Sequence, residues 1–277
     1  MGQFDSWLAD TVTVSGDPEG CAVSDNVLTL PLYYALGPMT QRRSGFRRFL
    51  SWGKRHASRI QLAISTPRLS FDRSEWTNKA QPGELAWHQT DQWRRSDDFM
   101  VDSARLFEHF GFAPNDFAGR VVLDLGAGSR LRTRYFEGAR IVAVEPLAEQ
   151  FRVLDFSDLD TAYEVHATPA EEFLPQWEGK VDLLVSINVL DHCYAFAAIV
   201  ANVRRYLAPS GQALLSFDVH PHSDSLHPLI IKPKTCRAAF RQNALRVTHE
   251  SKGFGDLGYR WYGHPPYAVT FIVRPSP

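Results

Sequence analysis

The sequence is poor in cysteine, has no long apolar run and carries almost no net charge. Its 277 residues include three cysteines, Cys21, Cys193 and Cys236, which lie far apart, and no Cys-x-x-Cys pair occurs. We therefore expect neither a disulfide framework nor a structural zinc site. No stretch approaches the about 20 apolar residues of a transmembrane helix, and the N-terminus lacks the pattern of a secretory signal. These absences, with a formal net charge of -1, predict a cytoplasmic protein without a general attraction for nucleic acid.

One segment departs from this balance of charges. Residues 41–61, QRRSGFRRFLSWGKRHASRIQ, carry several arginines and lysines and no acid. Phe46, Phe49 and Leu50 have helical spacing, which predicts a basic amphipathic helix. Two interpretations stay open. The helix packs by its apolar side and leaves its charges to solvent, or it contacts an anionic partner, which is an anionic acceptor, nucleic acid or lipid at the inner face of the membrane.

The order of predicted elements divides the chain near residue 98. Residues 1–98 predict an N-terminal extension and cap, which ends in an aromatic, loop-like lid at 71–95. Residues 99–277 alternate short apolar strands with helix-length segments, as βαβ units do. The predicted strands are 120–125, 139–144, 162–166, 181–187, 213–219, 245–250 and 267–273, and the predicted helices are 97–110, 195–207 and 232–243. This order predicts an α/β domain with a mostly parallel, seven-stranded, doubly wound sheet and an antiparallel last pair at its edge.

A glycine-rich turn follows the first predicted strand, in the stretch VVLDLGAGSR at 121–130. Such a turn is typical of nucleotide sites. Gly126 and Gly128 match the first two glycines of the dinucleotide pattern G-x-G-x-x-G, but Leu131 stands at the third. That glycine allows close packing of helix and strand, so its absence argues against a dinucleotide.

The stretch instead resembles the first motif of class I S-adenosylmethionine-dependent methyltransferases, of the type that acts on small molecules or glycans. Three further matches follow in order: IVAVEPL at 141–147, ATPAEEFLP at 167–175 and VDLLVSINVLDH at 181–192. Together they cover the chain from residue 99 onward and imply a Rossmann-like transferase with S-adenosyl-L-methionine as its cosubstrate. The chain departs from the pattern at Ser129-Arg130, because many members have a glycine at the position of Arg130.

The resemblance implies a cofactor site residue by residue. Asp124 would face the ammonium group of the cofactor, and Gly126, Ala127 and Gly128 would let the backbone approach it. Glu145, followed by Pro146, would accept hydrogen bonds from both ribose hydroxyls. Ala170 or Glu171 would lie along the adenine, and Asn188 and Val189 would pass the methionine part. Two alternatives without a role in cofactor binding stay open: Asp124 is an acid that caps a turn or helix, and Glu145 is a solvated residue at the end of its strand.

Candidate catalytic residues follow the fourth and fifth predicted strands, in NVLDHCY and DVHPHSDSLH. The carboxyl ends of these strands form one rim of the sheet, where substrates bind in this fold class. Methyl transfer to oxygen needs a base, and histidine titrates near neutrality. We predict His192 as this base, His220 as the second choice, and Asp191 as a third member. Alternatively, Asp191 caps the next helix and His192 stands at its start.

The same rim offers Asp218, His220 and His222 as ligands for a divalent metal, but their spacing is not diagnostic and we do not predict a metal site. Our leading interpretation is O-methylation of a small molecule, a sugar or a cell-envelope glycan. The alternatives are an RNA methyltransferase that uses residues 41–61, and a non-catalytic S-adenosylmethionine-binding partner protein. Nucleic acid is less favoured, because the chain shows no recognisable RNA-binding module.

Overall fold

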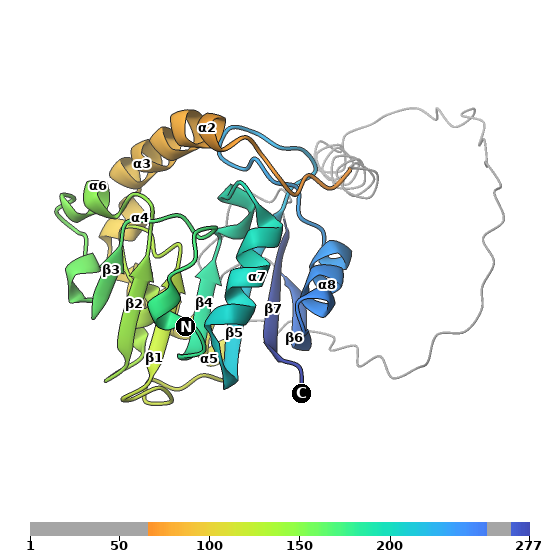
Figure 1. Ribbon diagram of the computed structural model, residues 1–277. Helices are drawn as coiled ribbons and strands as arrows, with labels where there is room; N and C mark the ends of the chain where they lie inside the picture. The colour runs from red at the N-terminus through yellow and green to blue at the C-terminus, as the bar shows by residue number, and fades with distance from the viewer. Residues whose placement is uncertain (1–65, 254–266) are drawn as a thin grey trace, which may run out of the picture. The chain divides into compact units, whose positions relative to one another are not determined.

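The structure is a computed structural model, which describes residues 66–253 and 267–277 (Figure 1). Residues 1–65, with the basic segment 41–61, and residues 254–266 lie outside the described residues. The strands are β1 (Val121–Leu125), β2 (Arg140–Val144), β3 (Glu164–His166), β4 (Val181–Ile187), β5 (Leu207–Val219), β6 (Leu245–Gly253) and β7 (Tyr267–Pro275). The longer helices are α3 (Gln81–Thr90), α5 (Asp98–His109), α7 (Phe196–Tyr206) and α8 (Pro233–Gln242), and the shorter ones are α2 (Arg73–Glu75), α4 (Gln92–Arg95) and α6 (Ala148–Arg152).

The strands form one seven-stranded sheet in the order β3-β2-β1-β4-β5-β7-β6. The pairs from β3 to β5 are parallel, and β7 runs antiparallel to β5 and to β6. This confirms the predicted fold class. The last two strands form the predicted antiparallel pair. In the structure β7 lies between β5 and β6, so β6 forms the edge of the sheet.

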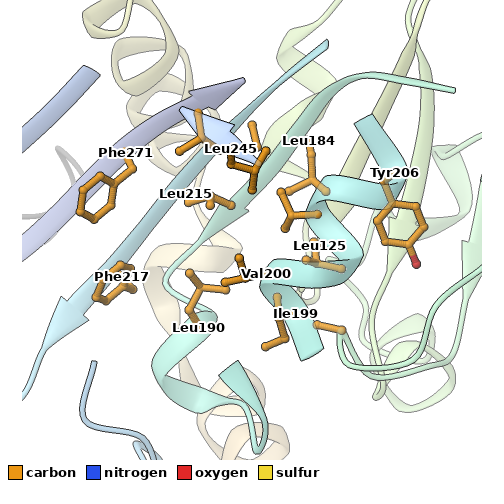
Figure 2. Packing of buried hydrophobic residues seen from close by; sticks show 14 of the residues in the cluster. Leu125, Leu184, Leu190, Ile199, Val200, Tyr206, Leu215, Phe217, Leu245 and Phe271 are labelled. Atoms are coloured by element: carbon orange, nitrogen blue, oxygen red, sulfur yellow. The ribbon is translucent and has the colours of Figure 1, made fainter. Parts of the chain in front are cut away.

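Both faces of the sheet are covered, which explains why β1 is buried along its whole length. Leu123 and Leu125 pack on one face, in a cluster with side chains of α7 and α8. Figure 2 shows part of this cluster, including Leu125 with Ile199 and Val200 of α7. Val122 points to the other face, where Phe107 of α5 packs. A strand buried on two faces reads as a continuous apolar run, as parallel strands do. Asp124 is the exception in β1, and its place at the strand's end brings it to the site.

The expectation that residues 71–95 are loop-like is wrong, because they form α2, a π-helical turn (Trp76–Ala80), α3 and α4. Short polar side chains begin these helices: Asp72 accepts from the amide of Glu75, and Asp91 from that of Trp93. The helices were not predicted because the segment has few strong helix signals: tryptophans are spread along it, and Pro82 and Gly83 interrupt it. In Figure 1, α2 and α3 lie across one end of the sheet.

The remaining differences concern the ends of elements. β5 begins at Leu207, directly after α7, and is therefore longer than predicted. β6 and β7 also extend beyond the predicted 245–250 and 267–273. Within residues 66–253 and 267–277, no helix has the length and apolar character needed to cross a bilayer.

Candidate active site

A cavity of about 380 Å³ lies between α3 and the carboxyl ends of the parallel strands. Its volume is within the range of about 300–1,000 Å³ that is usual for small-molecule sites. Its lining includes the predicted cofactor residues Asp124, Gly126, Ala127, Gly128, Glu145, Pro146, Ala170, Glu171, Asn188 and Val189, and the predicted catalytic residues His192 and His220. The structure thus brings together residues that the sequence spreads over about a hundred positions, although it leaves each assigned role a prediction.

The glycine turn shapes one wall of this cavity. Gly126 has a φ of 79° and Gly128 a φ of 68°, which are left-handed values that favour glycine. The amide of Gly126 donates to the carbonyl of Val144 over 2.8 Å, which holds the turn against the end of β2. A Cβ atom at Gly126 would lie 2.4 Å from both Cγ atoms of Val189. The turn and Val189 can meet only because residue 126 lacks a side chain.

Gly126→Ala is therefore expected to destabilise the fold by about 2–4 kcal/mol, from backbone strain plus overpacking. Gly179→Ala is the matched control, because Gly179 has a φ of 67° and an added Cβ would meet nothing within 4 Å. The control should cost only the strain of about 1–2 kcal/mol. Urea unfolding measures both. Equal losses in the two variants would contradict a contact between the turn and Val189.

Asp124 and Glu145 are buried acids that line the cavity. Asp124 accepts from the hydroxyl of Thr133 over 2.7 Å, and burial raises its pKa to about 6. Glu145 accepts from the amide of Leu147 with Oε1 and from the amide of Gly128 with Oε2, over 3.0 and 2.9 Å. Burial raises the pKa of Glu145 to about 7, although these two amides partly oppose it. Both acids are at most 6% exposed, so a solvated strand end does not describe Glu145.

Ser129 and Arg130, where the motif departs from its family, attach the helices above the cavity. The hydroxyl of Ser129 lies 2.8 Å from Nδ1 of His88 on α3. Nη1 of Arg130 donates to the carbonyls of Arg94 and Ser96, over 2.8 Å each. Arg130 stands where many family members have glycine. Its side chain binds the end of α4 and does not line the cavity.

Two other predicted cofactor residues have partners on neighbouring loops. Glu171 Oε1 accepts from the amides of Tyr194 and Ala195, over 2.6 and 3.0 Å, at the start of α7. The alternative in which Asp191 caps this helix is wrong, because the N-cap residue of α7 is Ala195 and no side chain caps the helix. Asn188 has a φ of 58°, an uncommon value outside glycine, so the chain turns sharply as it leaves β4.

Asp191 and three imidazoles that line the cavity form a cluster. Asp191 is fully buried, and its Oδ2 lies 2.9 Å from Nε2 of His220. Nδ1 of His192 lies 2.6 Å from Oε1 of Glu84 on α3. The ring of His227 packs on both, with centroids 4.1 Å from His220 and 4.5 Å from His192. The cluster joins α3 with the loops that follow β4 and β5.

Charges within the cluster bias its protonation. Burial alone would lower the pKa of His192, but Glu84 and Asp191 outweigh it and raise this pKa to about 9. Burial likewise acts to raise the pKa of Asp191, and the nearby His192 and His220 more than reverse it. The protein without bound ligands therefore holds an ionised Asp191 and a protonated His192 at neutral pH.

The structure also separates residues that the sequence grouped. His222 is exposed and lies outside the cavity lining, so the set Asp218, His220 and His222 is not assembled there. Trp93 of the expected lid donates to Asp102 on α5 over 3.1 Å, whereas Trp87 and Glu84 do line the cavity. His88 and Asp224 carried no signal in the sequence. His227 was visible only as one of several loop histidines.

The sheet order and the cavity at its carboxyl edge define the class I methyltransferase fold. Residues 123–215 match the family model described as a methyltransferase domain. The match covers 93 of the 277 residues, and the chain shares its α/β fold with solved methyltransferases. No curated protein matches the chain.

Two solved structures illustrate the likeness of the fold. One is the Burkholderia thailandensis 1,6-didemethyltoxoflavin-N1-methyltransferase with bound 1,6-didemethyltoxoflavin and S-adenosylhomocysteine, at 18% identity and a TM-score of 0.53, covering 77% of this chain and 94% of that one. The other is in the complex between the Haloferax volcanii Trm112 methyltransferase activator and the putative methyltransferase, at 17% identity and a TM-score of 0.52, covering 70% of this chain and 98% of that one.

Proposed function

We propose that the protein is an enzyme that transfers the methyl group of S-adenosylmethionine to an oxygen atom of a small molecule or a glycan. The observation that carries this proposal is the hydrogen bond between buried Asp191 and His220, a histidine that lines the same cavity as Glu145. A carboxylate that orients an imidazole is a common arrangement for proton transfer. An oxygen acceptor needs such a group, since it loses a proton when it is methylated.

The cofactor would lie along the wall formed by the ends of β1 and β2. Glu145 would accept hydrogen bonds from the ribose hydroxyls, and Asp124 would face the methionine ammonium, directly or through water. The turn at Gly126 and Gly128 lets the backbone come close, because no Cβ intervenes. Ala170 and Glu171 would lie beside the adenine, and Asn188 with Val189 beside the methionine part. Each of these side chains already lines the cavity.

The transfer is an in-line displacement. A lone pair of the acceptor oxygen forms the new bond to the methyl carbon while the bond from that carbon to sulfur breaks. The sulfonium takes up that electron pair and becomes the neutral thioether of S-adenosylhomocysteine. The acceptor proton passes to the imidazole. Holding nucleophile, carbon and sulfur in line supplies much of the rate enhancement.

His220 fits the proton acceptor better than His192, the first choice from the sequence. A proton on Nε2 of His220 is donated to Asp191, which leaves Nδ1 to accept the acceptor's proton. His192 has its pKa raised to about 9, so near neutral pH it already carries a proton. A group that is protonated before the reaction is a poor base.

Binding and turnover test the proposal separately. Calorimetry should show that the protein binds S-adenosylhomocysteine, and incubation with S-adenosylmethionine and a panel of sugars, phenols and hydroxy acids should release S-adenosylhomocysteine with at least one acceptor. The absence of binding at about 1 mM ligand, the upper end of usual KM values, would overturn the cofactor assignment. Binding without turnover on any oxygen acceptor would overturn the proposed reaction and favour a non-catalytic binding protein.

A further inference from the structure

We propose that Asp191, His192 and His227 bind one divalent transition-metal ion at the wall of the cavity, and that this ion holds the acceptor hydroxyl. The first part stands on the geometry of this chain alone. The second part rests on the proposed methyl transfer. This set was not predicted from the sequence, because its three residues come from two loops that α7 and β5 separate.

The three side chains already converge. Each offers one ligand atom, and these atoms all lie within 4.8 Å of one another. Oδ2 of Asp191 and Nε2 of His192 are 3.8 Å apart. Ligands at about 2.0–2.2 Å from a tetrahedral zinc ion stand about 3.3 Å apart, so side-chain adjustments are enough to close the site. The amide of Leu229 donates to the carbonyl of Asp191 over 3.2 Å, which fixes one loop on the other.

Both imidazoles are held by carboxylates at the nitrogen that faces away from the site. Nδ1 of His192 lies 2.6 Å from Glu84, and Nδ1 of His227 lies 3.0 Å from Oδ1 of Asp224. Asp224 is itself fixed, because it accepts from the amides of Leu226 and His227. This leaves Nε2 of each ring as the ligand atom. Histidine ligands of metal ions usually donate their other N–H to a carboxylate in this way, which sets the tautomer and the ring orientation.

Two buried polar atoms in this set have no hydrogen-bond partner among the described residues. They are Nε2 of His192 and Oδ1 of Asp191. Asp191 is fully buried, and its other oxygen, Oδ2, already accepts from His220. Buried polar atoms without partners are costly and call for an explanation. A metal ion bound by Oδ1 of Asp191 and Nε2 of His192 would give both atoms a partner, while Oδ2 of Asp191 keeps its hydrogen bond with His220.

The donor set indicates the kind of ion. Two imidazoles and one carboxylate suit zinc, iron, cobalt or manganese, whereas magnesium and calcium prefer oxygen ligands alone. Three protein ligands leave open positions, as in catalytic zinc sites.

The open positions lie beside the cavity, since His192 and His227 both line it. An acceptor hydroxyl bound to the ion would lose its proton more readily, because the cation stabilises the alkoxide. The proton would pass to His220, which shares Asp191 with the ion. The oxygen then attacks the methyl carbon, and the sulfonium leaves as the thioether.

A cobalt titration of the untagged, EDTA-treated full chain tests the metal site without any acceptor. Co²⁺ is the probe because its visible absorption reports coordination by the protein. We expect one Co²⁺ per chain in the wild type, and an affinity at least about 100-fold weaker in His192→Ala and in His227→Ala. Glu84→Gln should weaken binding by about 10- to 100-fold, since it acts through His192.

His222→Ala is the matched control, because His222 is an exposed histidine on the same loop that lies outside the cavity lining. It should bind Co²⁺ like the wild type. Binding of S-adenosylhomocysteine and thermal melting show that each variant is folded. No stoichiometric Co²⁺ absorption in a wild type that binds S-adenosylhomocysteine would overturn the site, and so would unchanged affinity in both His192→Ala and His227→Ala.

The same measurements keep the two proposals apart. If S-adenosylhomocysteine binds and methyl transfer proceeds in EDTA at the full rate, the ion's role in the transfer is overturned and the proposed function stands, while the Co²⁺ titration still decides the metal site. If Co²⁺ binds at the three side chains but no acceptor is methylated, the proposed function fails and the metal site stands.

Discussion

His220→Ala is expected to lower kcat by about 10²- to 10⁴-fold, the usual contribution of a positioned general base. The imidazole of His220 is oriented by Asp191 at 2.9 Å and is the group that we assign to take the acceptor's proton. Binding of S-adenosylhomocysteine should stay within about twofold of the wild type, because His220 follows β5, whereas the proposed cofactor residues Asp124 and Glu145 stand at the ends of β1 and β2. Single-turnover kinetics and calorimetry give the two numbers.

His222→Ala again serves as the control, and its kcat should equal that of the wild type. His192→Ala separates the base from the metal ligand. Both histidine variants at the cluster should be slow, but His192→Ala should also lose Co²⁺ binding, whereas His220→Ala should keep most of it. A His220→Ala enzyme that works near the wild-type rate would remove His220 as the base and return that role to His192, the residue first predicted.

The sequence was enough to predict the sheet and one wall of the cavity, because these depend on local patterns. Strands buried on two faces leave continuous apolar runs, and the glycine turn requires residues without a Cβ atom at 126 and 128. These requirements act on neighbouring residues, so they are visible in a short stretch. The ordered matches from Asp124 to Asn188 then indicated the cofactor.

The contacts of the histidine cluster and of α3 could not be predicted in the same way. Glu84 reaches His192 over 108 positions of sequence, and His88 reaches Ser129 over 41. Such contacts depend on where α3 lies over the sheet. The segment that forms α3 was predicted to be a loop because of its aromatic residues. Nor could the sequence show which of His222 and His227 enters the site, since both lie in the same loop after β5. Only the turn at Asp224 directs His227 inward.

Glu145→Ala is expected to weaken binding of S-adenosylhomocysteine by about 1.5–3 kcal/mol, which is about 10- to 150-fold. A carboxylate that accepts two ribose hydroxyls makes charge-assisted hydrogen bonds, and alanine removes them. The variant also leaves the amides of Leu147 and Gly128 without their acceptor. Glu145→Gln is therefore the better-matched change, since an amide oxygen can still accept one of these bonds. Unchanged affinity in both variants would remove Glu145 from the cofactor site.

The pH dependence of binding tests the same role through charge alone. Burial raises the pKa of Glu145 to about 7, so its carboxyl group is mostly protonated at pH 6 and mostly ionised at pH 8. If the ionised form is the stronger acceptor, affinity for S-adenosylhomocysteine should increase about tenfold over this range. Because binding favours the carboxylate, the affinity for S-adenosylhomocysteine decreases as the pH falls through 7. Glu145→Gln should flatten the profile, because its amide does not titrate. A tenfold slope that persists in Glu145→Gln would assign the titration to another group, and Asp124, with its pKa near 6, would be the next to substitute.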